Sequence, residues 1–92
     1  MSHNGIEIKG LSFVLTCAVC PEQYDVYTNK DEMVGYVRLR HGYLCAEYPD
    51  VGGRVVYSAD TEGDGCFANK EERMYHLNNI ADALLKTING VK

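Results

Sequence analysis

Arginine and tyrosine alternate with apolar residues in the middle of the chain, and their spacing suggests a binding surface. Tyr36, Arg38 and Arg40 stand two residues apart, so a β-strand would place all three side chains on one face. The guanidinium group binds carboxylates and phosphates, and tyrosine provides stiff contact area. The alternative is an ordinary solvated sheet face with cross-strand pairs. The candidate partner- or ligand-binding residues are Tyr27, Tyr36, Arg38, Arg40, Tyr43 and Arg54.

An acidic segment with interspersed glycines follows at 60–71. Asp60, Glu62 and Asp64 alternate, a glycine comes next, and Glu71 completes the segment. This spacing resembles the calcium-binding loop of EF-hand proteins, which implies calcium ligation by these four acidic residues. The segment departs from that pattern because Glu62 is longer than the usual residue and a predicted strand, not a helix, precedes it. A tight turn between a strand and a helix would select the same residue types.

The four cysteines allow a second kind of metal site. Cys17 and Cys20 form a C-x-x-C motif, which together with Cys45 and Cys66 would provide four thiolates for zinc. Zinc ribbons usually have two such pairs, whereas Cys45 and Cys66 are single and far apart. Reduced cysteines that act as small apolar residues explain the same positions. We therefore expect no cofactor, with calcium at the acidic segment as the first alternative and zinc as the second.

The histidines do not form a recognisable catalytic group. His3 lies near the N-terminus, His41 fits a hairpin turn, and His76 lies beside Arg73 on the solvated side of a predicted helix. The sequence contains no glycine-rich phosphate loop before a helix, no nucleophile elbow and no H-E-x-x-H motif. We expect that the protein is not an enzyme.

Length and charge narrow the class of protein further. The 92 residues suit one domain, 1–92, and the formal net charge of −4 argues against non-specific binding to duplex DNA. No apolar run approaches the roughly 18 residues of a membrane span, so we expect no membrane partner. The basic N-terminal region of a secretory signal is also missing. We therefore expect a cytoplasmic protein whose cysteines are reduced.

The central strands can be paired from the sequence. A two-residue hairpin loop of histidine and glycine pairs Arg40 with Tyr43 and separates an apolar face from an arginine- and tyrosine-rich face. The following turn aligns the next strand so that Arg54 and Val56 share the arginine-rich face. A four-residue loop in the preceding hairpin places Tyr27 on this face as well.

The remaining elements complete an α+β domain. Residues 1–5 form a loose end, residues 6–59 form strands, and residues 69–89 form a helix that Asn69 caps. The apolar residues of this helix fall on one stripe, which must pack against the apolar sheet face. The predicted fold is an antiparallel meander of four to five strands packed on one C-terminal α-helix. The stripe consists of Met74, Leu77, Ile80, Ala81, Leu84, Leu85 and Ile88.

Three short strings are similar to small uncharacterised proteins encoded by bacteriophages and mobile elements. They are VGYVRLRHG at 34–42, GDG at 63–65, and the pair Glu72 and Arg73. The resemblance implies a cytoplasmic, non-catalytic protein that docks a host protein, such as an anti-defence or anti-CRISPR inhibitor. The alternatives are a binder of a small anionic ligand, a nucleotide or single-stranded nucleic acid at the arginine-rich face, and a metal module at the acidic segment. A homodimer through an unpaired strand edge is a further possibility.

Overall fold

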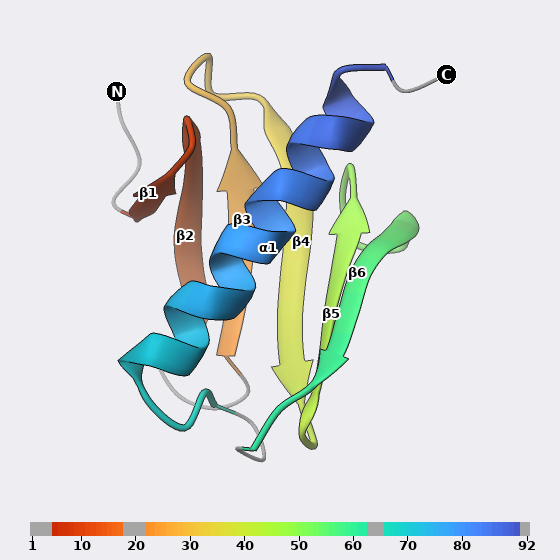
Figure 1. The fold of residues 1–92 in the computed structure, drawn as a ribbon. Coiled ribbons are helices and arrows are strands. Elements are labelled where there is room, and N and C mark those ends of the chain that lie inside the picture. The colour runs from red at the N-terminus through yellow and green to blue at the C-terminus, as the bar shows by residue number, and fades with distance from the viewer. Residues whose placement is uncertain (1–4, 18–21, 63–65, 91–92) are drawn as a thin grey trace.

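In the computed structural model, which describes residues 5–17, 22–62 and 66–90, one antiparallel sheet of six strands lies against a helix (Figure 1). The strand order follows the chain, so the sheet is a meander and the predicted α+β class is confirmed. The sheet has one strand more than the upper predicted number, because a turn with positive φ at Lys9 (55°) and Gly10 (86°) separates a short first strand from the second. The elements are β1 (Ile6–Ile8), β2 (Leu11–Cys17), β3 (Glu22–Tyr27), β4 (Met33–Arg40), β5 (Tyr43–Tyr48), β6 (Arg54–Asp60) and α1 (Lys70–Ile88).

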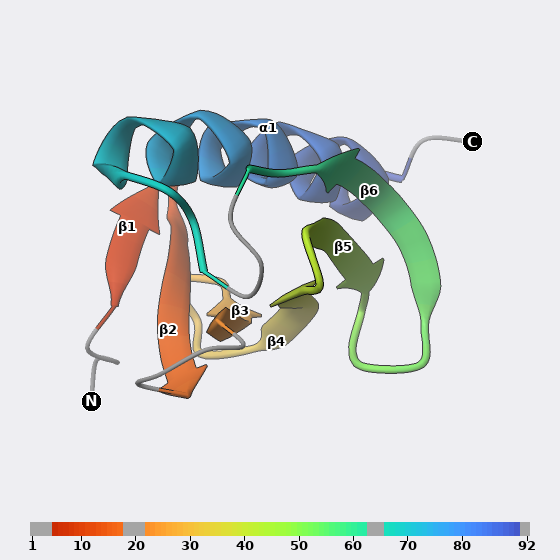
Figure 2. The ribbon, with the colours of Figure 1, turned by 90° about the horizontal axis from the view of Figure 1, so that it is seen from below.

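The sheet curls around the helix, and no described element covers the other face of the sheet. Figure 2 shows β1 and β6 bending toward α1 on its two sides, so the helix lies in a concave trough. The core fills the space between the helix and the sheet, and its largest fully buried side chains come from both layers. They are Phe13, Leu11, Leu39, Leu44, Leu77, Ile80, Leu84, Val26 and Val37.

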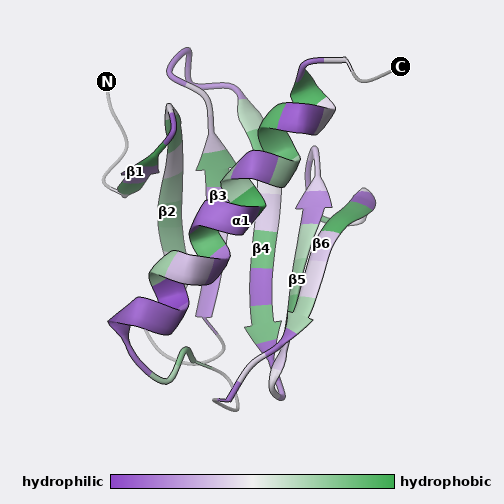
Figure 3. Ribbon diagram, in the orientation of Figure 1, coloured by the Kyte–Doolittle hydropathy of each residue, from purple (hydrophilic) through white to green (hydrophobic). Residues whose placement is uncertain are grey.

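The period of two in β4 decides which face its side chains occupy. Val37 and Leu39 are fully buried against the helix, while Arg38 between them is on the convex side. The same alternation is visible as changing hydropathy along β4 in Figure 3. The predicted two-residue hairpin is confirmed, because His41 (φ 55°) and Gly42 (φ 74°) are both left-handed and Arg40 pairs with Tyr43.

The helix begins directly after the predicted cap, Asn69, and its last residue is Ile88, close to the predicted end at 89. The Asn69 side chain accepts a hydrogen bond of 2.8 Å from the Glu72 N–H, which caps the first turn. Gly90, with φ of 72°, follows the last turn, and its N–H donates to the Thr87 carbonyl. Among the residues that the structure describes, no helix has the length and apolar character needed to cross a membrane.

Candidate functional site

The first candidate surface is the convex side of the sheet, which points away from α1 (Figure 2). Since the alternate residues of β4 and β5 are buried against the helix, the residues between them face outward. Arg40 lies directly opposite Tyr43, whose side chain is half exposed. Tyr36 and Arg38 precede Arg40 on β4 and alternate with the buried residues of this strand, so they lie on the same side of the sheet as Arg40. We call these four residues, Tyr36, Arg38, Arg40 and Tyr43, the Tyr/Arg face.

The cationic part of the Tyr/Arg face lies next to the β4–β5 hairpin. Neither Arg38 nor Arg40 forms an ion pair with a carboxylate in the described part of the chain. Arg38 lies opposite Cys45. Burial and the charge of Glu47 raise the pKa of the Cys45 thiol, against the opposing effect of Arg38. Both guanidinium groups are therefore available to an external carboxylate or phosphate.

The other part of the convex surface is acidic. Asp25 and Glu47 lie on either side of Tyr36 in one row across the sheet. Burial raises the pKa of Asp25, the charge of Asp50 raises it further, and a hydrogen bond with Tyr27 acts in the opposite direction. The Tyr27 side chain therefore belongs to this acidic part. The convex surface is divided into a cationic end near the β4–β5 hairpin and an acidic end near the β5–β6 turn.

Arg54 does not belong to the convex surface, so this part of the sequence prediction is wrong. The predicted pairing continues as far as Ala46 and Tyr57, but a β-bulge then adds Val56, so that Tyr48 pairs with Arg54. One extra residue moves the side chains beyond it to the opposite face. Val56 consequently packs against the core, and Arg54 lines a groove beside α1.

The predicted calcium ligands are not gathered in the described part of the acidic segment. Glu62 and Glu71 are exposed, and Asp60 ends β6. Asp64 lies outside the described residues. Within the described ranges, no three histidine, cysteine, aspartate or glutamate side chains form a group that could bind a metal ion. The calcium hypothesis therefore stays a prediction that requires Asp64.

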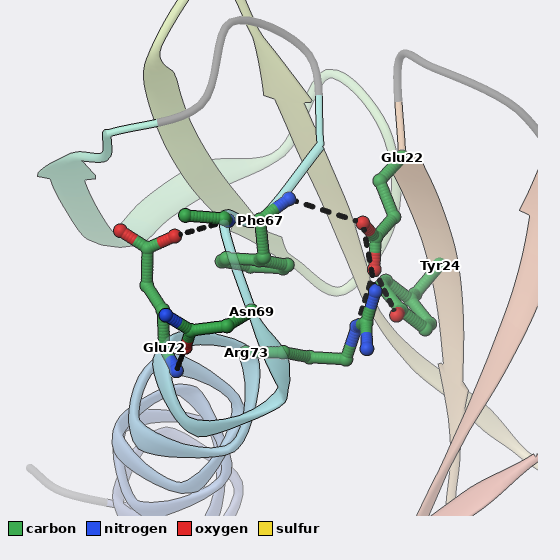
Figure 4. Close-up of polar contacts among 7 residues, drawn as sticks. Glu22, Tyr24, Phe67, Asn69, Glu72 and Arg73 are labelled. Carbon is green, nitrogen blue, oxygen red and sulfur yellow. Dashed lines mark hydrogen bonds and ion pairs between the residues drawn. The ribbon is translucent and has the colours of Figure 1, made fainter.

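A neighbouring carboxylate connects this segment to the helix. Glu72 Oε1 accepts a hydrogen bond of 2.7 Å from the Ala68 N–H, and its Oε2 accepts one of 3.1 Å from the Glu62 N–H. These two hydrogen bonds lower the pKa of Glu72. Figure 4 shows this carboxylate beside the capping contact of Asn69. Glu72 therefore stabilises the start of α1 and the chain that leads to it.

The cysteines differ from the prediction that all four are reduced. Cys66 is disulfide-bonded, and its partner lies outside the described side chains. Cys45 is a free thiol on the convex side of the sheet. A disulfide sulfur is not a thiolate, so Cys66 cannot complete the proposed four-thiolate zinc site. Cys20 lies outside the described residues, as does the side chain of Cys17.

The main polar cluster in the described part of the chain surrounds Glu22 (Figure 4). Arg73 Nε donates a hydrogen bond of 2.8 Å to Glu22 Oε2, and the Phe67 N–H donates one of 3.3 Å to Oε1. Tyr24 Oη also donates to Glu22 Oε2. The Arg73 guanidinium lies 5.8 Å from the centre of the Phe67 ring. We call Glu22, Tyr24, Phe67 and Arg73 the Glu22 cluster.

The Glu22 cluster connects elements rather than presenting a reactive group. Burial alone would raise the pKa of Glu22, but the hydrogen bonds from Arg73, Tyr24 and Phe67 lower it below its usual value. Burial and the neighbouring Glu22 raise the pKa of Tyr24 strongly. At neutral pH the cluster therefore contains a carboxylate, a guanidinium and a neutral phenol in fixed contact. These contacts join β3 to the start of α1.

A second polar contact lies further along the helix and corrects the prediction for His76. This residue is only 7 % exposed, not solvated. Its Nδ1 lies 2.8 Å from Tyr57 Oη on β6, and its ring stacks on Phe67. Asn79 Nδ2 also contacts Tyr57 Oη, at 3.4 Å.

Sequence reasoning missed Glu22, although positional signals were present. Glu22 has the same parity as the buried Tyr24 and Val26, so the alternation of β3 directs it inward. Arg73 precedes Leu77 by one helical turn and therefore continues the apolar stripe. Both residues are charged, so sequence reasoning did not assign them to core-facing positions. Comparison with protein-family models, with curated proteins and with solved structures found no match for this chain.

Proposed function

We propose that this chain is a non-catalytic binding protein that docks a protein partner through the Tyr/Arg face. The observation that carries the proposal is the position of α1, which packs on the concave side only and leaves the convex side uncovered by any described element (Figure 2). Tyr43 is half exposed there, beside Arg38 and Arg40, which form no ion pair within the described residues. Tyrosine and arginine are enriched in protein interfaces and dominate their energetics.

The charge pattern supports a protein partner over a nucleic acid. Asp25 and Glu47 lie on the same surface as Arg38 and Arg40, and the chain has a net charge of −4. A polyanion would be attracted at one end of this surface and repelled at the other. A protein with acidic groups opposite the arginines and basic groups opposite the carboxylates is complementary to both ends. The alternative, in which this face binds a small anionic ligand, still has Arg38 and Arg40 as anion-binding residues but not Arg54, which lies on the helix side of the sheet.

The resemblance to small phage proteins makes a bacterial defence protein the partner class that we propose to test first. Such a partner would be met in the host cytoplasm. The disulfide of Cys66 weighs against that location, because cytosolic thiols are normally kept reduced. The location therefore needs its own measurement.

The test uses two exposed residues that face each other across β4 and β5. Replacing Arg40 and Tyr43 by alanine should weaken the affinity for a captured bacterial partner at least about tenfold, since interface anchors of this kind contribute more than about 1.4 kcal/mol. Arg54→Ala is the matched control, because this arginine lies on the other side of the sheet. Affinity is measured by titration calorimetry with the purified partner.

Hydrogen exchange on the same complex locates the interface. Protection of 36–47 together with loss of affinity in the Arg40/Tyr43 double variant supports the proposal. Equal affinity of the double variant and the wild type, with an unchanged thermal melt, would contradict it. If a second copy of the chain alone protects 36–47, the Tyr/Arg face is a homodimer interface and does not dock another protein.

A further inference from the structure

An open groove of about 470 Å³ lies between β6 and the C-terminal half of α1. Val55 and Val56 form its strand side, next to Arg54. Lys86 and Asp82 are on its helix side. The groove is separate from the Tyr/Arg face, since the bulge in β6 turns Arg54 to the helix side of the sheet.

One wall of this groove is a strand at the edge of the sheet. In the sheet order β6 is the last strand, and β5 is its one partner among the described strands (Figure 1). Among the described residues, the other backbone hydrogen bonds next to this strand come from the Gly53 N–H and the Thr61 N–H, which lie just outside its two ends. The outer edge of Arg54–Asp60 therefore presents free N–H and C=O groups to an extended chain. The site is open instead of enclosed, which suits a peptide strand better than a compact ligand.

The charges of the groove select the kind of strand. Arg54 and Lys86 are both exposed, and neither forms an ion pair within the described residues. Asp82 already has a cationic neighbour, because Lys9 Nζ lies 3.7 Å from its Oδ1. The groove is therefore cationic on a chain whose net charge is −4. Val55, which is 51 % exposed, adds an apolar position at the same edge.

We propose that this groove binds an extended acidic segment of another protein, which adds a strand to the free edge of β6. The partner's backbone pairs with β6, its carboxylates contact Arg54 and Lys86, and its alternate apolar side chains contact the exposed Val55. This inference does not depend on the Tyr/Arg face.

The probe is a labelled peptide of about eight residues that alternates glutamate and valine, titrated into the full chain and followed by fluorescence anisotropy. Two matched peptides serve as controls, one with lysine in place of glutamate and one with proline in place of alternate valines. The first removes the charge complementarity, and the second keeps the charge but cannot form a strand. Only the glutamate–valine peptide should bind saturably, with hydrogen-exchange protection of Arg54–Asp60.

Charge reversal on the protein tests the assignment to the groove. Arg54→Glu with Lys86→Glu should weaken peptide binding by about tenfold or more, whereas Arg54→Lys with Lys86→Arg should retain it. The Arg40/Tyr43 double alanine variant should bind the peptide like the wild type, so this inference and the proposed function can fail separately. Equal binding of the proline peptide, or protection of β6 by self-association without peptide, would overturn the proposal.

Discussion

A carboxylate is unfavourable in a protein interior unless charged or polar groups surround it, and Glu22 is 5 % exposed. The Glu22 cluster supplies those groups, with Arg73 from α1 and Tyr24 from the same strand. The hydrogen bond from the Phe67 N–H also connects the chain before α1 to β3. At the scale of the residue, this carboxylate therefore determines how the start of the helix is attached to the sheet.

Glu22→Gln should lower the free energy of unfolding at pH 7 by about 2–3 kcal/mol, because Arg73 loses its charged partner. Urea denaturation measures the change. Glu71→Gln is the matched control, since Glu71 is an exposed residue in the first turn of the same helix. Its loss should stay below about 1 kcal/mol, the usual range for a charge near a helix terminus. Similar losses in the two variants would contradict the role given to Glu22.

The difference in free energy of unfolding between wild type and Glu22→Gln should also depend on pH, and the sign of this dependence follows from the pKa of Glu22. The pKa of Glu22 is lower in the folded state, so the unfolded state binds more protons as the pH falls. The stabilisation is fully present above the unfolded value of about 4.3 and is lost as the pH falls from there through the lower folded value. The difference in free energy of unfolding between wild type and Glu22→Gln should therefore shrink below about pH 4.3. A constant difference down to pH 3 would exclude this linkage.

At the scale of the element, the close approach of α1 to β4 depends on a glycine. A Cβ added at Gly35 would lie 2.9 Å from Leu84 Cδ1 and 3.2 Å from its Cδ2, both in the core. Any larger residue at this position must push the helix or the leucine away. The strand therefore tolerates a residue of low β propensity because the packing of the next layer requires it.

Gly35→Ala should lower the free energy of unfolding by about 1–3 kcal/mol through overpacking. The cause can be isolated with Leu84→Val, which shortens the opposing side chain. In the Leu84→Val background the alanine substitution should cost less, and a double-mutant cycle measured by urea denaturation quantifies the difference. Strict additivity would attribute the loss to the strand backbone instead of the helix contact.

At the scale of the whole molecule, a covalent link supplements a core of limited size. A chain of 92 residues buries a smaller fraction of its surface on folding than a larger domain does, and Cys66 is disulfide-bonded. A disulfide stabilises chiefly by restricting the unfolded chain. The link also bears on where the protein resides, because a structural disulfide persists in an oxidising compartment.

Cys66→Ser should lower the free energy of unfolding by about 2–4 kcal/mol. Cys45→Ser should have little effect, because Cys45 is a free thiol on the convex side. Thermal melting with and without a reductant provides the check. Reductant should lower the melting temperature of the wild type and leave Cys66→Ser unchanged. A wild type that melts identically in both conditions would restore the prediction of reduced cysteines.

Local patterns in the sequence were sufficient for the helix, for the central strands and for most of their register, but not for the separation of the short first strand. The alternation in β4 and β5 predicted which side Arg40 and Tyr43 occupy, and the capping residue Asn69 predicted where α1 starts. These features depend on neighbours within a few positions, so their physical causes are contained in short stretches of chain.

Tertiary structure decided the features that depend on distant or irregular contacts. The partner of Glu22 is Arg73, which is 51 positions away in the sequence. Burial of the Glu22 charge is unfavourable unless a partner of opposite charge lies beside it, and only the tertiary fold brings Arg73 there. The bulge at Val56 moved Arg54 to the helix side, because the last strand had to follow both the β5 pairing and the curvature around α1. The binding groove beside β6 exists only as a result of that placement. The sequence by itself therefore determined the helix, the central strands and the four residues of the Tyr/Arg face, whereas packing determined which charged residues are buried, paired or exposed.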